Sequence, residues 1–252
     1  MDVSLFITCL TDNFYPRVGQ AVVAVLEHVG CTVRFPSAQT CCGQPMFNSG
    51  YHDDARDLAK RMIEVFEDAE VVVTPSGSCA AMIRDYYHEL LADDPNWAQR
   101  SDALCNKTFE FVEFLVKKQN VDLKALGCRW SLNDAPTRTT YHYSCHLRGI
   151  GMTEEAPTLL KQIEGIDYVP LPKKEQCCGF GGTFAVKYPD ISGAIVHDKV
   201  SCIEQTNADV IVCNDGGCTM NIEGAAHRKG TDVKFMHIAE IIAEGLGLVP
   251  TS

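Results

Sequence analysis

The chain has 252 residues, of which 46% are hydrophobic and 22% are charged, and its formal net charge is -11. This acidic balance argues against a nucleic-acid partner, because proteins that bind phosphate backbones carry an excess of basic side chains. The longest apolar stretches fall well short of the roughly 18 residues that a membrane-spanning helix requires. The first residues also lack the basic start of a signal peptide. We therefore expect a globular, cytoplasmic protein with no transmembrane segment.

Strands and helices are predicted to alternate along the first half of the chain. Short apolar runs predict strands at 3–8, 32–35 and 71–74, and apolar residues at helical spacing predict helices at 16–30, 53–68, 80–91 and 109–118. A loop containing glycine and proline is expected at 41–50. This alternation is typical of βαβ units and predicts a mostly parallel sheet.

The second half repeats this order after a segment at 127–138 whose turn residues mark it as a linker. Strands are expected at 139–143, 168–171 and 210–212, and helices at 156–163, 189–206, 219–228 and 238–246. We therefore predict an α/β fold of two similar Rossmann-like lobes, 1–126 and 139–252, related by an internal pseudo-two-fold repeat.

Eight of the 13 cysteines form two sets with the same order and largely the same spacing. Each set has a lone cysteine, an adjacent pair followed by glycine, and a later cysteine in a glycine-bearing turn. The sets are Cys9, Cys41, Cys42 and Cys79 in the first half, and Cys145, Cys177, Cys178 and Cys218 in the second. A disulfide framework would need an oxidising compartment and usually a smaller scaffold. We therefore interpret both sets as ligands of a metal or cluster.

Four of these cysteines, Cys9, Cys79, Cys145 and Cys218, directly follow predicted strands, where parallel sheets collect their ligands. Helices begin shortly afterwards, and we expect their N-terminal ends to lower the thiol pKa. Four thiolates suit zinc as well as an iron–sulfur cluster. The adjacent pairs favour the cluster, because neighbouring side chains diverge and do not easily converge on one ion. Zinc is the alternative.

The other cysteines and the histidines near the repeats are expected to have structural roles. Free cysteine is among the most buried residue types, so a core role is expected for the unrepeated cysteines, which are Cys31, Cys105, Cys128 and Cys202. We expect His146 to form a hydrogen bond at a helix end rather than to bind a metal, and His142 and His237 to be histidines at strand or helix ends.

The order of a cysteine, a Cys-Cys-Gly motif and a later cysteine, present twice, resembles the CCG cysteine-rich domain family of iron–sulfur oxidoreductase subunits. The resemblance covers nearly the whole chain, and the layout is most similar to the lactate utilization branch of the family. It implies that both cysteine sets bind one or two iron–sulfur clusters, of the 4Fe-4S type. It also implies an electron-transfer subunit of a complex that oxidises L-lactate to pyruvate. The implied partners are a ferredoxin-type iron–sulfur subunit resembling lactate utilization protein B and a further subunit.

One departure from the family separates the functional alternatives. The heterodisulfide reductase branch ends each repeat in C-x-x-C, whereas Ser76 and Asp215 stand at the first of those positions here. This departure argues against thiol–disulfide reduction, which is one alternative function; a zinc-binding structural subunit is the other. Cys213 is a possible fifth ligand in the second repeat, where the first has Thr74. The chain has no ferredoxin-type C-x-x-C-x-x-C run, so a partner is expected to carry serial electron transfer.

Overall fold

The computed structural model describes residues 1–249, so the last three residues of the predicted second lobe, 250–252, lie outside the described residues. It contains two four-stranded parallel sheets, with strand orders β2-β1-β3-β4 and β6-β5-β7-β8. The strands are β1 (Asp2–Leu5), β2 (Thr32–Arg34), β3 (Val71–Thr74), β4 (Thr108–Glu110), β5 (Thr137–Tyr141), β6 (Ile166–Tyr168), β7 (Val210–Cys213) and β8 (Lys234–His237). The predicted α/β fold of two similar lobes is confirmed.

The helices occur in a similar order in the two lobes. The first lobe has α1 (Cys9–Phe14), α2 (Pro16–His28), α3 (Gln44–Asn48), α4 (His52–Val65), α5 (Gly77–Ala81), the π-helical turn η1 (Met82–Tyr86), α6 (Tyr87–Leu91), α7 (Pro95–Lys107), α8 (Phe111–Glu113) and the π-helical turn η2 (Phe114–Lys118). The second has α9 (Cys145–Gly149), α10 (Glu155–Leu160), α11 (Phe184–Lys187), α12 (Pro189–Glu204), α13 (Gly216–Lys229) and α14 (Ile238–Gly245). None of the helices within residues 1–249 is long and apolar enough to cross a membrane.

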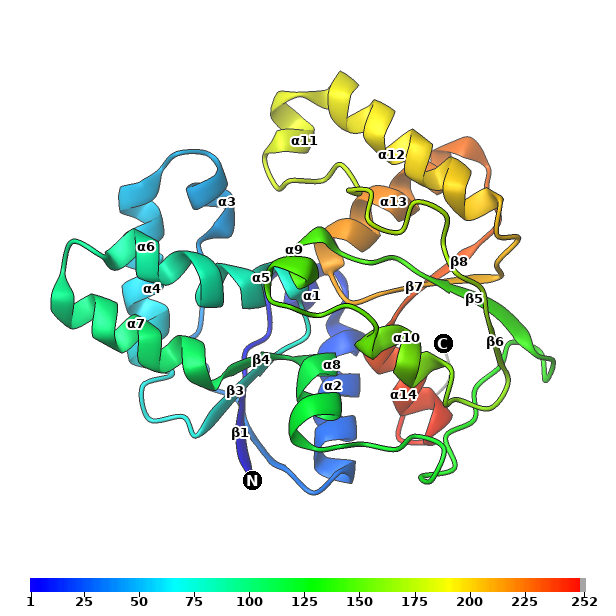
Figure 1. The fold of residues 1–252 in the computed structure, drawn as a ribbon, viewed down its shortest axis with the longest axis horizontal. Helices are drawn as coiled ribbons and strands as arrows, with labels where there is room; N and C mark the ends of the chain where they lie inside the picture. Colours follow the sequence, from blue (N-terminus) through cyan, green and yellow to red (C-terminus); the bar gives the residue numbers. More distant parts are fainter. Residues whose placement is uncertain (250–252) are drawn as a thin grey trace.

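The lobes contact each other through reciprocal pairs of helices, as an internal two-fold repeat requires. Helix α2 packs against α14, and the equivalent pair α10 and α8 is also in contact. Helix α5 contacts α9, and the equivalent pair α13 and α1 does the same. Figure 1 shows α2, α8, α10 and α14 between the two sheets, with α4, α6 and α7 on the outer side of the first sheet. The same contacts therefore join the lobes twice.

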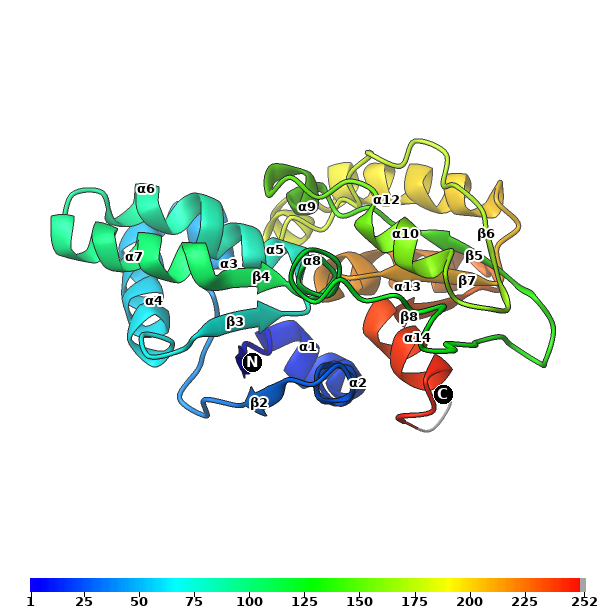
Figure 2. The ribbon, with the colours of Figure 1, turned by 60° about the horizontal axis from the view of Figure 1, so that its bottom comes forward.

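One hydrophobic core passes through both lobes, and a smaller one lies on the outer side of each sheet. The shared core contains Val22 and Leu26 of α2 together with Ile241 and Ile242 of α14. In Figure 2, α2 and α14 lie at the bottom of the molecule, on the side away from α6 and α12. Because apolar surface from both lobes is buried in one core, we expect the lobes to unfold together.

The predicted linker is more ordered than its turn residues indicate. Trp130 lies in the shared core, and its indole N–H donates to Glu244 at 2.8 Å. Arg129 forms an isolated parallel bridge with Glu164. Cys128 and Trp130 therefore pack into the core, where the buried tryptophan finds a partner for its N–H group, whereas 133–136 are exposed.

Several short elements were not predicted. The strands β4 and β8 complete the two sheets, although 109–118 reads as one helix and no strand is expected after 212. Helix α7 begins where Asp94 accepts hydrogen bonds from Asn96 and Trp97, with Pro95 at its first turn. No helix is predicted between 91 and 109, yet an aspartate cap followed by proline is typical of a helix start. The short helices α1, α3, α9 and α11 were also missed.

Candidate metal centre between the lobes

A cavity of about 300 Å³ lies between the two lobes, and all eight cysteines of the two sets line it. Gln44, Ser78, His146, Phe180 and Asp215 contribute to the rest of its wall. The carboxyl ends of parallel strands in both sheets lead to this space, which is where such sheets place their ligands. The two sets, expected on separate rims, therefore face one shared cavity.

The ends of four strands position the two cysteines of each set that lie outside the adjacent pair. Cys9 and Cys145 are the first residues of α1 and α9, which follow β1 and β5. Cys79 and Cys218 lie in the first turns of α5 and α13, which follow β3 and β7. Each pair thus occupies equivalent places in the two lobes, since the strand order is the same.

The adjacent cysteine pairs lie in loops that turn at a glycine. Gly43 and Gly179 have φ values of 88° and 84°, in the left-handed region that favours glycine. Their backbone N–H groups lie 3.5 and 3.3 Å from the sulfurs of Cys41 and Cys177. A Cβ atom at position 179 would lie only 2.8 Å from the carbonyl oxygen of Ser192. Glycine is therefore required for the sharp turn that brings both cysteines of a pair to the cavity.

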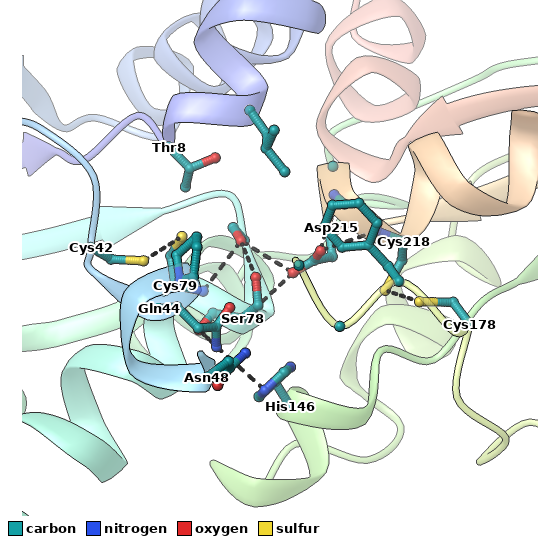
Figure 3. Close-up of a pocket in the computed structure, with 18 of the residues that line it drawn as sticks. Thr8, Cys42, Gln44, Asn48, Ser78, Cys79, His146, Cys178, Asp215 and Cys218 are labelled. Carbon is teal, nitrogen blue, oxygen red and sulfur yellow. Dashed lines mark hydrogen bonds between the residues drawn. The ribbon is translucent and has the colours of Figure 1, made fainter. Parts of the chain in front are cut away.

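Sulfur atoms of each set lie in close pairs. The measured Sγ–Sγ distances are 3.8 Å for Cys9 and Cys41, 3.2 Å for Cys42 and Cys79, and 3.1 Å for Cys178 and Cys218. Figure 3 shows the second and third of these pairs on opposite sides of the cavity, with Ser78 and Asp215 between them. Soft thiolate donors at this spacing fit zinc or an iron–sulfur cluster.

Hydrogen bonds among the thiols divide each set into acidic and non-acidic members. Bonds from neighbouring cysteine thiols lower the pKa of Cys41 to about 3 and that of Cys177 to about 2. Hydrogen bonding to other cysteines, followed by burial, raises the pKa of Cys9, Cys145 and Cys218. At the start of α1 the backbone N–H of Leu10 lowers the pKa of Cys9, as expected for a helix N-terminus, but the hydrogen bond to Cys41 and burial outweigh this effect. Metal binding at the sets must displace their protons.

Two side chains at the ends of the fourth strands connect the lobes beside the cavity. Glu110 accepts a hydrogen bond from the side-chain N–H group of Asn214 in the other lobe, at 2.9 Å. His237 lies 3.1 Å from the carbonyl oxygen of Pro75 in the other lobe. Both residues also cap the closing helices of their own lobes. These reciprocal bonds hold the two cysteine-bearing turns together.

Asp215, which replaces a C-x-x-C cysteine, links the turns of both lobes. Its carboxylate accepts hydrogen bonds from the backbone N–H of Ser78 at 2.9 Å and the hydroxyl of Ser76 at 3.2 Å. It also accepts from the N–H groups of Gly217 and Cys218, at the start of α13. This structural role was missed by sequence reasoning, although an aspartate directly before a helix is a known capping signal.

The unrepeated cysteines do not line the cavity. The expected core role is confirmed for Cys31, Cys128 and Cys202, which are buried. Cys105 is only half-buried, and its thiol donates to a backbone carbonyl 3.3 Å away. Cys213 is buried behind the cavity wall beside the backbone of Asp215, so its role as a fifth ligand stays a prediction.

The three histidines near the repeats, His142, His146 and His237, differ in burial and in hydrogen bonding. His237 caps α14 by accepting the N–H group of Ala239 at 3.1 Å, as predicted for a helix end. His146 lines the cavity and lies 3.3 Å from the side-chain nitrogen of Gln44 in the other lobe. His142 is fully buried, and neither ring nitrogen has a hydrogen-bond partner. His142 directly follows β5, as predicted for a histidine at a strand end.

His237 is expected to make the protein less stable in mild acid. Burial lowers its pKa to about 4, and its Nδ1 must stay unprotonated to accept the N–H group of Ala239. Because the unfolded histidine has a pKa near 6.5, the unfolded state binds more protons as the pH falls below that value. Stability is thus lost on acidification, by about 1 kcal/mol between about pH 7.5 and about pH 5.5.

The variant to compare with the wild type is His237→Asn, because asparagine also caps helices but does not titrate. Urea unfolding of both proteins across this pH range measures the effect. We expect the wild type to lose more stability than the variant on acidification. Equal losses in the two proteins would contradict this role for His237.

A family model described as the cysteine-rich domain, CCG, matches residues 3–84 and 139–223 of the chain. The two matches cover the two cysteine sets and correspond to the two repeats seen in the fold. The chain belongs to the CCG cysteine-rich domain family.

Proteins named lactate utilization protein A are similar to the chain along nearly its full length. The protein from Halalkalibacterium halodurans is 52% identical over 96% of each chain. The protein from Shouchella clausii is 50% identical over 96% of this chain and 98% of its own. Among solved structures, glutamate racemase from Francisella tularensis covers 100% of this chain and 84% of its own, with 12% identity and a TM-score of 0.36.

Proposed function

We propose that the chain is an iron–sulfur electron-transfer subunit of a cytoplasmic complex that oxidises L-lactate to pyruvate. The observation that carries the proposal is the single cavity lined by two equivalent sets of four thiols. The names of its relatives, lactate utilization protein A, supply the substrate. An electron carrier needs a redox centre held by the protein, and thiolates are the usual ligands of iron–sulfur clusters.

The two cysteine sets would hold one or two clusters, of the 4Fe-4S type, and a bound cluster would supply one-electron redox chemistry. The work of this chain is to bind and shield that group. Leu10, Pro45 and Phe180 provide apolar wall beside the thiols. Apolar surroundings and backbone N–H groups near the sulfurs, such as that of Gly179, are the means by which a protein tunes such a centre.

The cavity wall offers few acids or bases for lactate chemistry. Apart from cysteines, its titratable side chains are Asp215 and His146. Asp215 is occupied by hydrogen bonds to the starts of α5 and α13. Oxidation of an alcohol carbon requires a group that accepts its proton. We therefore place that step on other subunits, among them a ferredoxin-type iron–sulfur protein resembling lactate utilization protein B.

The isolated chain is therefore expected not to oxidise lactate, whereas the complex should. The measurement is lactate-dependent dye reduction, first by this chain alone and then after co-expression with the ferredoxin-type subunit and the further subunit. Because the chain carries a net charge of -11, its association with a basic partner face should weaken as salt increases. Full turnover by the isolated chain would contradict the electron-transfer proposal.

Zinc is the second candidate, and a specific group of residues favours considering it. The ligand atoms of His142, Cys178 and Cys218 lie within 4.8 Å of one another, and such a mixed set is typical of structural zinc sites. Zinc without sulfide after anaerobic purification would make this chain a structural subunit. Turnover of a small disulfide by the isolated chain would instead indicate a thiol–disulfide reductase.

A further inference from the structure

The second cysteine set has a neighbour that the first set lacks. His142 lies between β5 and α9, is fully buried and has no hydrogen-bond partner at Nδ1 or Nε2. An unpaired imidazole in a protein interior is costly, because its desolvated nitrogens gain nothing in return. Its ring nitrogen lies within 4.8 Å of the sulfurs of Cys178 and Cys218. A group that binds these sulfurs would also provide the missing partner for His142.

The equivalent residue in the first lobe is Phe6. The backbone N–H of Phe6 donates to Val73 at 2.9 Å, and that of His142 donates to Val212 at 2.8 Å. These two acceptors occupy the same register in β3 and β7, so the two donors are equivalent in the repeat. The first lobe therefore places a phenyl ring where the second places an imidazole.

A second pair of equivalent residues also differs between the surroundings of the two cysteine sets. Gly43 lies against Ala55 of α4, and Gly179 lies against Ser192 of α12 in the same way. Counting along the two helices from these contacts pairs Met62 with Lys199, and both are fully buried. The ammonium group of Lys199 donates to a backbone carbonyl at 3.1 Å and interacts electrostatically with the cysteines of the second set. The second set thus has basic neighbours where the first has apolar ones.

We propose that His142 is a ligand of the metal centre in the second lobe, so that the two centres differ: thiolates alone in the first lobe, thiolates with an imidazole in the second. The inference rests on the proposed function, in that it requires a metal centre at each cysteine set. Neutral imidazole is a common ligand of both iron and zinc.

The geometry needs little adjustment for such a site. With metal–sulfur distances of about 2.3 Å and metal–nitrogen distances of about 2.0 Å, the tetrahedral ligands of one metal ion place two sulfurs about 3.8 Å apart and a sulfur and a nitrogen about 3.5 Å apart. The sulfurs of Cys178 and Cys218 are 3.1 Å apart, and His142 lies within 4.8 Å of both. Within residues 1–249, no other group of three histidine, cysteine, aspartate or glutamate side chains brings its ligand atoms this close together.

The consequence is a difference in reduction potential. A neutral imidazole that takes the place of one thiolate at the second-lobe centre leaves this centre with less negative charge than thiolates alone would, and this raises the reduction potential of an iron–sulfur centre. The buried ammonium of Lys199 acts in the same direction, because it favours the more negative reduced state. The second-lobe centre is therefore reduced at a higher potential than the first-lobe centre.

The test uses the full chain with Cys41→Ser and Cys42→Ser, purified anaerobically, which retains only the second-lobe centre. Pulsed EPR of the reduced protein should detect a nitrogen coupling that changes on labelling with nitrogen-15 histidine. X-ray absorption at the edge of the bound metal should show a nitrogen ligand beside sulfur. The coupling should disappear in His142→Phe and in His142→Cys, the latter keeping its metal through a thiolate, and the potential should fall in both variants.

Lys199→Met is the matched control, because it reproduces Met62 of the first lobe and should keep the nitrogen coupling while lowering the potential. Full iron and sulfide without any histidine coupling would overturn the inference and leave the proposed function intact. Absence of iron and sulfide would overturn the proposed function. In that case X-ray absorption of whichever metal is bound still decides whether His142 is a ligand.

Discussion

Anaerobically purified protein is expected to be brown and to contain iron and acid-labile sulfide. The double variant Cys41→Ser, Cys42→Ser should lose the iron and sulfide bound by the first lobe. The Cys177→Ser, Cys178→Ser variant should remove the share of the second lobe. Serine hydroxyls are poor substitutes for thiolates at an iron–sulfur centre, and each pair contributes two of the four thiols of its set. Iron and sulfide analysis with visible absorption measures the effect.

Cys105→Ser is the control for this experiment. Cys105 lies outside the cavity wall, and a serine hydroxyl can replace its hydrogen bond to the nearby carbonyl. We expect the control to keep its full iron and sulfide content. Equal losses in all three variants would indicate general instability rather than ligand loss, and stoichiometric zinc with no sulfide would refute the cluster.

Gly179→Ala is expected to destabilise the second Cys-Cys-Gly loop by roughly 2–4 kcal/mol. The glycine has a φ of 84°, and the new Cβ would lie 2.8 Å from the carbonyl oxygen of Ser192 in α12. Relief of this contact requires the loop to move away from α12, and Cys177 and Cys178 would move with the loop. We therefore expect a lower melting temperature together with loss of second-lobe sulfide.

Gly193→Ala in α12 provides the matched control on the same helix. A Cβ atom there meets nothing within 4 Å, and its backbone is helical. Alanine in a helix interior is more favourable than glycine by roughly 0.5–1 kcal/mol, so this variant should be as stable as the wild type or slightly more so. A Gly179→Ala protein as stable as Gly193→Ala would show that the left-handed turn is not required.

Much of the fold could be predicted because its signals are local. The strand at 71–74 matches β3 in both bounds, and the helix at 189–206 differs from α12 only at its end. The repeat of Cys-Cys-Gly at 41–43 and 177–179 was enough to indicate two similar lobes, since equivalent motifs occupy equivalent places in a duplicated fold. Glycine after each pair also indicated a sharp turn. These inferences depend only on neighbouring residues and on spacing.

The relation between the lobes could not be predicted, because it depends on contacts between distant residues. Nothing in the spacing of the cysteines indicates that both sets line one cavity, which follows from the packing of α2 on α14 and of α5 on α9. The cross-lobe bonds of Glu110 and His237 join residues more than 100 positions apart. Nothing in the local sequence identifies their partners, Asn214 and Pro75.

The chemical difference between the two cysteine sets also required the three-dimensional structure. In the sequence His142 is one of eight histidines, and a histidine near a strand end is usually satisfied by hydrogen bonds. Its burial, its two unpaired nitrogens and its approach to Cys178 and Cys218 are properties of the folded protein. Sequence spacing thus determined which thiols belong together, whereas tertiary packing determined what else surrounds them, because burial and hydrogen bonding depend on neighbours brought together by folding.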